Sequence, residues 1–249
     1  MLKIIYLGNA GIIVETAGER YIFDGLYSDR GHTFGPMSKK ILDFLYNDEM
    51  NTKNNFLVFT HFHPDHFSLE RVENFLKIHP TTTLIIPKYN ISKKIEYIEK
   101  NQEVIYLKPD REIKNLKING DKLYYFATKH DGKSYADIVN MCYLLNIGEK
   151  NIWITGDTDY IGEDFNQIID KKIDLCIVNP LFFNFPRGRR ILRELKIKNV
   201  IVYHIPLKEY DDYSIRDLVK SDIKNNGGDF NIVPLTIPGQ YMELAKRRW

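Results

Sequence analysis

The sequence lacks the features that mark several classes of protein. It has only two cysteines, Cys142 and Cys176, and both stand in apolar runs. This gives no support to a disulfide framework and predicts buried core thiols. No apolar stretch approaches the 18 or so residues that a membrane span needs. A secretory signal needs an unbroken apolar run, but Gly8 and Asn9 interrupt the N-terminal one. We therefore expect a soluble, cytoplasmic protein.

Strong charge is also missing, and so are low-complexity segments, short repeats and long linkers. The net charge of +2 is too small to indicate a nucleic-acid partner by itself. Hydrophobic residues make up 43% of the chain and charged residues 27%, a balance that excludes intrinsic disorder. The length of 249 residues allows one large domain or two small ones.

The hydrophobic pattern predicts strands at the start of each half of the chain and interleaved helices later. This order favours an α/β protein with two sheets, without excluding a single doubly wound sheet. Strands are expected at Lys3–Leu7, Gly11–Thr16, Arg20–Asp24, Asn55–Thr60, Thr83–Ile86, Glu103–Leu107, Glu112–Ile118, Lys122–Thr128, Ile138–Ile147, Asn151–Thr155, Ile173–Val178, Asn199–His204, Asn231–Leu235 and Gln240–Leu244. Helices are expected at Ser38–Tyr46, Leu69–Ile78, Ile91–Lys100, Gly162–Ile169, Arg189–Leu195 and Ser214–Lys224.

The densest cluster of metal-binding side chains is HFHPDH at residues 61–66, directly after an apolar strand. Imidazole nitrogens and carboxylate oxygens are the ligands that zinc accepts at roughly 2.0–2.2 Å. Pro64 cannot donate a hydrogen bond to a sheet, so the chain leaves the sheet there. The first two histidines then face one way, and Asp65 and His66 can reach a second, neighbouring position.

Six residues cannot complete the coordination of two metal ions, so further ligands are expected elsewhere in the chain. His130, Asp157 and His204 each follow a separate apolar strand, and strand ends are where open α/β sheets place their sites. A single residue of this kind is more often structural. Three of them together favour a second group of ligands.

These motifs resemble those of the metallo-β-lactamase superfamily of metal-dependent hydrolases, and the resemblance runs essentially from end to end. It implies an α/β fold, a four-layer αβ/βα sandwich. One domain would cover residues 1–249, with two similar halves at roughly 1–120 and 121–249. It also implies two metal ions bridged by Asp157. Asp24 would support the metal ligands without binding metal itself. By the resemblance, the first metal is held by His61, His63 and His130, and the second by Asp65, His66 and His204.

Differences from other branches of the superfamily narrow the resemblance. Asp157 stands where one main type of β-lactamase carries cysteine, which argues against antibiotic hydrolysis. His63 stands where flavodiiron relatives carry glutamate, which favours zinc over a redox di-iron site. The layout of YLGNAGIIVE (residues 6–15) and the compact C-terminal half are similar to the branch of L-ascorbate-6-phosphate lactonase. Two Zn²⁺ ions per chain are expected, although Mn²⁺ or Fe²⁺ also suits such ligands.

The leading hypothesis is a binuclear hydrolase. Two zinc ions about 3.5–4 Å apart would lower the pKa of a shared water, and the hydroxide would attack a small ester, lactone or phosphodiester. Asp65 and Asp24 are the catalytic candidates, Asp65 as proton donor to the leaving group and Asp24, with Thr60, as support for ligand histidines. Two alternatives stay open: a nuclease or cyclic-nucleotide phosphodiesterase, and a non-catalytic, metal-stabilised binding module. We expect a small-molecule substrate, with no membrane or nucleic-acid partner, and a homo-oligomer is compatible with the sequence.

Three further features have simpler interpretations. The segment Leu181–Arg190 is either a lid with an aromatic wall and a basic edge for phosphate, or core aromatics followed by a solvated helix start, and we favour the second. His32 either reaches the site or is an ordinary surface histidine, and again we favour the second. His79 precedes Pro80 at a helix end and needs no functional explanation.

Overall fold

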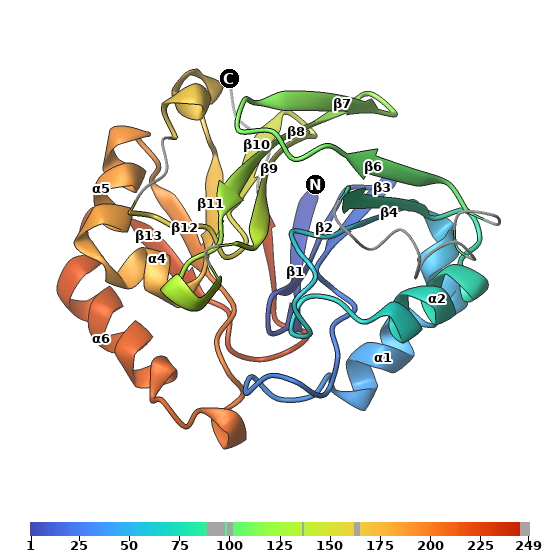
Figure 1. Ribbon diagram of the computed structural model, residues 1–249, viewed down its shortest axis with the longest axis horizontal. Helices are drawn as coiled ribbons and strands as arrows, with labels where there is room; N and C mark the ends of the chain where they lie inside the picture. The colour runs from blue at the N-terminus through green and yellow to red at the C-terminus, as the bar shows by residue number, and fades with distance from the viewer. Residues whose placement is uncertain (89–97, 99–101, 136, 162–164, 245–249) are drawn as a thin grey trace. The chain divides into compact units, whose positions relative to one another are not determined.

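Two seven-stranded sheets, one in each of two units, form the framework of the computed structural model (Figure 1). The first unit comprises Met1–Pro109 and Ile237–Trp249, and the second comprises Asp110–Thr236. The structure describes residues 1–88, 98, 102–135, 137–161 and 165–244.

The sheet of the first unit is antiparallel from β14 to β3 and parallel from β3 to β6. Its inner parallel strands are continuous apolar runs, as expected of strands that are buried on both faces. Since β3 and β4 are parallel neighbours, Asp24 and the motif at residues 61–66 follow strand ends that lie at the same end of the sheet. In spatial order the strands are β14 (Tyr241–Leu244), β1 (Leu2–Gly8), β2 (Gly11–Glu15), β3 (Glu19–Phe23), β4 (Asn54–Val58), β5 (Thr83–Pro87) and β6 (Val104–Leu107).

Helices α1 (Lys39–Leu45) and α2 (Leu69–Ile78) pack on this sheet (Figure 1), and the 3₁₀ helix η1 (Asp48–Thr52) lies between them in the chain. Each helix begins at a serine whose hydroxyl accepts a backbone N–H, Ser38 for α1 and Ser68 for α2. Both helices share one apolar core with the strands, made by Ile5, Leu7, Ile13, Ile22, Ile41, Leu45, Leu57, Val72, Phe75 and Leu76 among others.

The sheet of the second unit repeats this layout, with an antiparallel part from β7 to β10 and a parallel part from β10 to β13. The residues expected to bind metal follow β8, β10 and β12. In chain order the strands are β7 (Lys114–Ile118), β8 (Asp121–Lys129), β9 (Val139–Ile147), β10 (Lys150–Ile154), β11 (Leu175–Val178), β12 (Asn199–Val202) and β13 (Asn231–Pro234).

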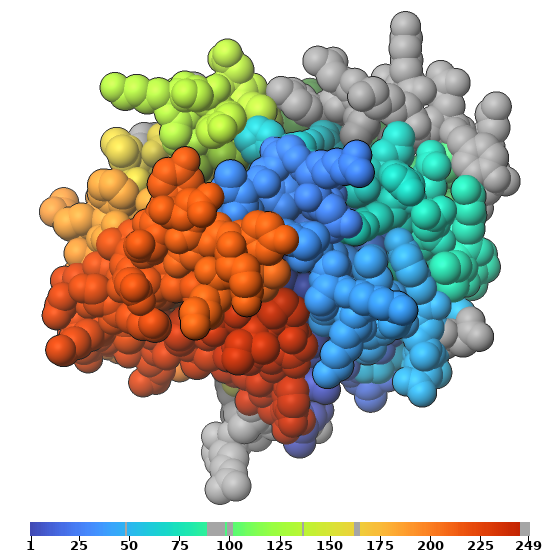
Figure 2. All heavy atoms as spheres, turned by 90° about the horizontal axis from the view of Figure 1, so that it is seen from below, coloured from blue at the N-terminus to red at the C-terminus, as the bar shows by residue number. Residues whose placement is uncertain are grey.

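Helices also pack on the second sheet (Figure 1), and apolar residues of strands and helices form one core there. The carboxylate of Asp211 accepts the N–H groups of Ile215 and Arg216 at 2.7 and 2.9 Å, so this residue caps α6. Figure 2 shows α6 and the segment before it as an orange to red surface. The helices are α4 (Pro180–Asn184), α5 (Pro186–Glu194) and α6 (Ile215–Asn226), with the 3₁₀ helices η2 (Lys133–Tyr135), η3 (Asn166–Lys171) and η4 (Lys208–Tyr210).

Two predicted helices are not confirmed. One lies almost entirely outside the described residues, and the other is a different type of helix. The helix predicted at Ile91–Lys100 lies outside the described residues, except for Ile98. The helix predicted at Gly162–Ile169 is wrong from Asn166 onwards, where the chain forms η3. Only Ile168 of η3 is buried, so this segment offers no apolar stripe to hold an α-helix against the sheet.

The segment Leu181–Arg190 forms α4 and the start of α5. Phe182 and Phe183 belong to the core of the second unit, as the favoured interpretation predicted. The prediction of a solvated helix start is wrong for Arg189, which is buried and donates hydrogen bonds to the carbonyls of Phe183 and Asn184. Arg189 therefore ties the two short helices together.

The last strand, β14, belongs to the first unit, because it pairs with β1. The sequence placed the division of the chain near residue 120, and whether the chain is a single domain stays a prediction. Of the helices in the described residues, none is both long enough and apolar enough to cross a membrane.

A buried ion pair provides a test of how the first sheet is stabilised. Arg20 Nε lies 2.7 Å from Glu15 Oε2, and Arg20 also donates to the Met50 carbonyl. We expect Arg20→Ala to lower the free energy of unfolding by about 2–3 kcal/mol, because a buried carboxylate loses one of its partners. Urea unfolding should show this. The exposed Lys220, paired with Asp217, is the control: Lys220→Ala should change stability by less than about 1 kcal/mol.

The same ion pair predicts a pH dependence. Burial raises the pKa of Glu15, but hydrogen bonds and charges from Arg20 and Lys53 outweigh it and lower the pKa below its ordinary value of 4.5. Glu15 therefore contributes stability that is present above pH 4.5 and is lost as the pH falls through the lower pKa of the folded state. The difference between wild type and Arg20→Ala should shrink there. A constant difference at all pH values would contradict this explanation.

Candidate metal centre

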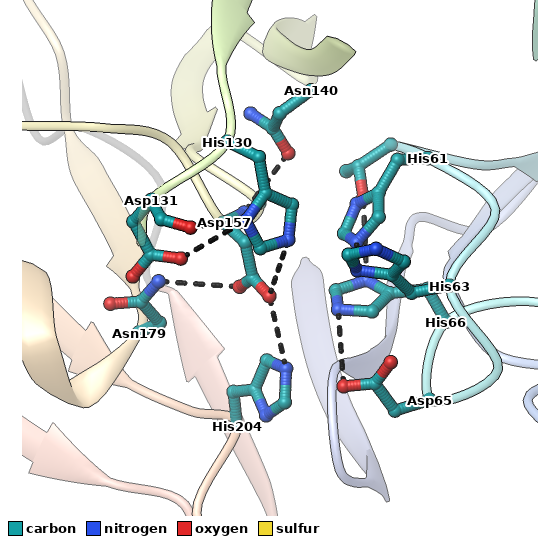
Figure 3. Close-up of polar contacts among 12 residues, drawn as sticks. His61, His63, Asp65, His66, His130, Asp131, Asn140, Asp157, Asn179 and His204 are labelled. Atoms are coloured by element: carbon teal, nitrogen blue, oxygen red, sulfur yellow. Dashed lines mark hydrogen bonds and ion pairs between the residues drawn. The ribbon is translucent and has the colours of Figure 1, made fainter. Parts of the chain in front are cut away.

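The motif at residues 61–66 forms a tight turn after β4 and brings its ligand atoms together in pairs (Figure 3). His61 Nε2 lies 3.1 Å from His63 Nδ1. His66 Nε2 lies 3.9 Å from Asp65 Oδ2. The first unit therefore presents two pairs of ligand atoms, as the spacing of the motif predicted.

Asp24 determines how the ligand histidines carry their protons. Its carboxylate is fully buried and accepts the N–H and the hydroxyl of Thr60 at 2.8 and 2.7 Å. Its Oδ2 also lies 2.9 Å from His66 Nδ1, which must then be the protonated nitrogen of that ring. Because the Thr60 hydroxyl donates to Asp24, its oxygen accepts from His61 Nδ1 at 2.9 Å. Both histidines therefore present an unprotonated Nε2, the form that binds metal.

Backbone contacts hold the ligand turn from two sides. Ser28 N–H donates to the Pro64 carbonyl at 2.7 Å. The side-chain amide of Asn9 donates to the Asp65 carbonyl from the turn between β1 and β2. Asn9 is 3% exposed and has a φ of 50°, a left-handed conformation that asparagine tolerates better than most residues. The first hairpin of the chain thus anchors a residue of the motif.

The second unit gathers His130, Asp157 and His204 from the ends of β8, β10 and β12 (Figure 3). One carboxylate oxygen, Asp157 Oδ2, lies 3.6 Å from His130 Nε2 and 3.4 Å from His204 Nε2. These distances are long for hydrogen bonds. They suit ligand atoms that share a cation. All three residues are buried, and His204 has a φ of 56°, in the left-handed region that few residues other than glycine adopt.

Asp131 is a further acidic group that sequence reasoning passed over, although it directly follows His130. Its carboxylate lies 3.2 Å from His130 Nδ1, and its carbonyl lies 2.7 Å from the same atom. His130, Asp131 and Asp157 form one of the groups that could hold a metal ion. Burial raises the pKa of Asp131, and the charge of Asp157 raises it further. Burial lowers the pKa of His130, but its contacts with Asp131 and the charge of Asp157 outweigh burial and raise it.

Two buried asparagines hold Asp157 in place, and neither was predicted as a site residue. Asn140 Oδ1 accepts the backbone N–H of Asp157 at 2.9 Å. Asn179 Nδ2 donates to Asp157 Oδ1 at 3.2 Å. Asn179 directly follows β11, a strand-end position like those of the predicted ligands, and this is the signal that could have found it.

Known proteins resemble this chain in fold rather than in sequence. No family model matches the chain, and no curated protein matches its sequence. The chain is similar to the metallo-β-lactamase fold protein YhfI from Bacillus subtilis, with 14% identity and a TM-score of 0.66 over 98% of this chain and 100% of that one. The chain has the metallo-β-lactamase fold.

Two other solved structures share this metallo-β-lactamase fold. One is Igni18, a metallo hydrolase from the archaeon Ignicoccus hospitalis, at 15% identity and a TM-score of 0.64 over 98% of this chain and 99% of that one. The other is CmlA, a diiron β-hydroxylase from Streptomyces venezuelae, at 15% identity and a TM-score of 0.68 over 98% of this chain and 54% of that one. The fold expected from the sequence is therefore confirmed.

The spacing between the histidine nitrogens and the Asp157 oxygen suits a divalent cation. Two nitrogens bound at 2.0–2.1 Å to one tetrahedral ion lie about 3.3 Å apart. His61 Nε2 and His63 Nδ1 are 3.1 Å apart, and the oxygen of Asp157 lies 3.4 Å from the nitrogen of His204. Imidazole and carboxylate ligands fit zinc, manganese or iron. The residues that belong to groups able to hold a metal ion are His61, His63, Asp65 and His66 of the first unit and His130, Asp131, Asp157 and His204 of the second.

The remaining histidines and the cysteines do not join these clusters. His32 lies in the loop before α1, where it is partly buried rather than an ordinary surface histidine, and its ring nitrogens contact the backbone of Ser28 and Phe34. His79 is buried and contacts Asn51 and the Leu45 carbonyl. Cys142 and Cys176 are buried, as predicted.

Asn9 offers a test of how the ligand turn is anchored. Asn9→Gly keeps the left-handed backbone but removes the donor to the Asp65 carbonyl, so we expect the free energy of unfolding to fall by about 1 kcal/mol. Asn119 is a matched control, because it occupies the turn between β7 and β8 with a φ of 45° and is exposed. Asn119→Gly should change stability by less than about 0.5 kcal/mol. If both substitutions change the free energy of unfolding equally, as measured in urea, the Asn9 amide does not anchor the Asp65 carbonyl, and Asn9 only stabilises the turn between β1 and β2.

Proposed function

We propose that this protein is a binuclear metal-dependent hydrolase of a small ester, lactone or phosphodiester. One observation carries the proposal: Asp157 Oδ2 stands within 3.6 Å of His130 Nε2 and within 3.4 Å of His204 Nε2. A single oxygen placed beside two histidine nitrogens from different strand ends suits a ligand that bridges two cations. A structural zinc site needs no such oxygen, because one ion takes four ligands of its own.

The ligand count supports the same conclusion. The first unit offers two pairs of candidate ligand atoms, and the second offers His130 Nε2 and His204 Nε2 beside one shared oxygen, Asp157 Oδ2. A pair is only half of what a four-coordinate ion requires. We therefore propose that each ion takes ligands from more than one of these pairs. His61, His63 and His130 would hold one ion, Asp65, His66 and His204 the other, and Asp157 both.

The residues around the ions have distinct tasks. Bound divalent cations would supply Lewis acidity, which lowers the pKa of water and polarises the oxygen of an ester or phosphoester. Asp24 and Thr60 keep His61 and His66 in the tautomer that presents Nε2. Asp65 is fixed through its backbone by Asn9, and its carboxylate at the ligand turn would pass a proton to the leaving group.

Hydrolysis is favoured over oxidation for two reasons. The metallo hydrolase Igni18 shares the fold over 99% of its own length, whereas the diiron β-hydroxylase shares it over 54% of its length. His63 also keeps an all-imidazole pair beside His61, which suits zinc, although manganese or iron would fit. We further propose a small-molecule substrate, a place in the lactonase-like branch of the superfamily, and a cytoplasmic location in keeping with the two buried thiols.

Metal content is the first test of the proposal. The purified protein should contain about two metal ions per chain by elemental analysis. His61→Ala and His204→Ala should each lose metal, because each removes one ligand of a different proposed ion. His32→Ala is the matched control and should keep the wild-type content, since the ring of His32 is held within its own loop. Absence of stoichiometric metal, even after reconstitution with Zn²⁺, Mn²⁺ or Fe²⁺, would sink the proposal.

A substitution of Asp65 distinguishes an enzyme from a metal-stabilised binding module. At saturating metal, Asp65→Asn should lower kcat on a chromogenic ester, lactone or phosphodiester by at least about 100-fold, while thermal unfolding stays close to that of wild type. A module would show the reverse, with stability lost and no turnover in either protein. The preferred substrate of the wild type also decides between a small-molecule hydrolase and a nuclease or phosphodiesterase.

A further inference from the structure

The amide of Asn179 serves two neighbours at once. It is 4% exposed and lies between β11 and α4. Asn179 Oδ1 accepts the backbone N–H of Phe182 at 2.9 Å and so caps α4, while Nδ2 donates to Asp157 Oδ1 at 3.2 Å. The same side chain therefore begins a helix and contacts the proposed bridging carboxylate (Figure 3).

The helix cap fixes which way the amide points. If the amide were turned over, its oxygen would face the carboxylate of Asp157 and its NH₂ group would face the N–H of Phe182. Both contacts would then be repulsive. Only the observed orientation satisfies both neighbours, so the donor must face Asp157. Pro180, at the first position of α4, has no N–H and does not compete for the cap.

This contact divides the work of the two oxygens of Asp157. Oδ1 is engaged by Asn179, whereas Oδ2 is the atom near His130 and His204. The main chain of Asp157 is held as well, because its N–H donates to Asn140 Oδ1, and the amide of Asn140 donates to the Thr155 carbonyl at 2.8 Å. With backbone and one oxygen fixed, rotation of the carboxylate is prevented.

We propose that Asn179 is a positioning residue that reserves Asp157 Oδ2 for the metal ions by holding Oδ1. This inference rests on the proposed function, because it presumes that Asp157 binds metal. It assigns α4 a task in the metal centre, since the first residue before that helix sets the orientation of a ligand. Hydrogen bonds to ligand carboxylates commonly change metal affinity by about 10–100-fold.

The test is a set of substitutions that separate the two contacts. Asn179→Ser keeps an acceptor for the Phe182 N–H but is too short to reach Asp157. Asn179→Asp also keeps the cap, since serine and aspartate both cap helices well, but it places a carboxylate against a carboxylate. Ser38→Ala is the control for loss of a cap alone, because Ser38 caps α1 and has no ligand as a partner.

Metal affinity is measured by competition with a chelator, using Zn²⁺ as the probe, and thermal unfolding of the metal-free proteins is measured alongside. We expect Asn179→Ser and Asn179→Asp to bind Zn²⁺ about 10–100-fold more weakly. Metal-free Asn179→Ser should unfold within a few degrees of the wild type, and Ser38→Ala should bind Zn²⁺ as the wild type does. Wild-type affinity in Asn179→Ser would overturn the inference and leave Asn179 as a helix cap only. If the wild type itself binds no stoichiometric Zn²⁺, Mn²⁺ or Fe²⁺, the proposed function fails and this inference with it.

Discussion

The hydrogen bonds of Asp24 determine which nitrogen of two histidines carries a proton. Asp24 accepts from Thr60 and from His66, and Thr60 in turn accepts from His61. A neutral imidazole has one donor and one acceptor, so these contacts decide the state of both rings. Because all of these groups are buried, an unsatisfied atom would cost about 1–3 kcal/mol, and the arrangement is strongly preferred. The availability of Nε2 of His61 and His66 to a cation depends on this one carboxylate.

A second carboxylate has a comparable place in the other unit. Asp157 is held through its N–H by Asn140 and through one oxygen by Asn179. Both units therefore fix their candidate metal ligands with buried polar contacts at the ends of strands. Such networks stabilise one conformation only when every member has a partner. Rigid ligands of this kind need little rearrangement when a cation binds.

The backbone conformations at these positions are costly. Asp24 and His204 have φ values of 47° and 56°, and residues other than glycine in this region cost roughly 1–3 kcal/mol each. Each follows a strand in the parallel part of its sheet, where the chain must turn sharply to keep a side chain at the sheet edge. The apolar cores between sheets and helices hold the strands in place, and this burial offsets the strain.

The sequence by itself determined the regular parts of the protein and the ligand types. Apolar runs predicted the strands of both sheets, and apolar periodicity predicted helices at Ser38–Tyr46 and Leu69–Ile78, because these are local properties of the chain. The spacing of residues 61–66 also predicted paired ligand atoms. The tertiary structure alone decided the contacts of Asn140, Asn179 and Asn9, since each joins residues far apart in sequence. It also decided that η3 is a 3₁₀ helix and that β14 returns to β1, because both depend on packing against strands that no local pattern specifies.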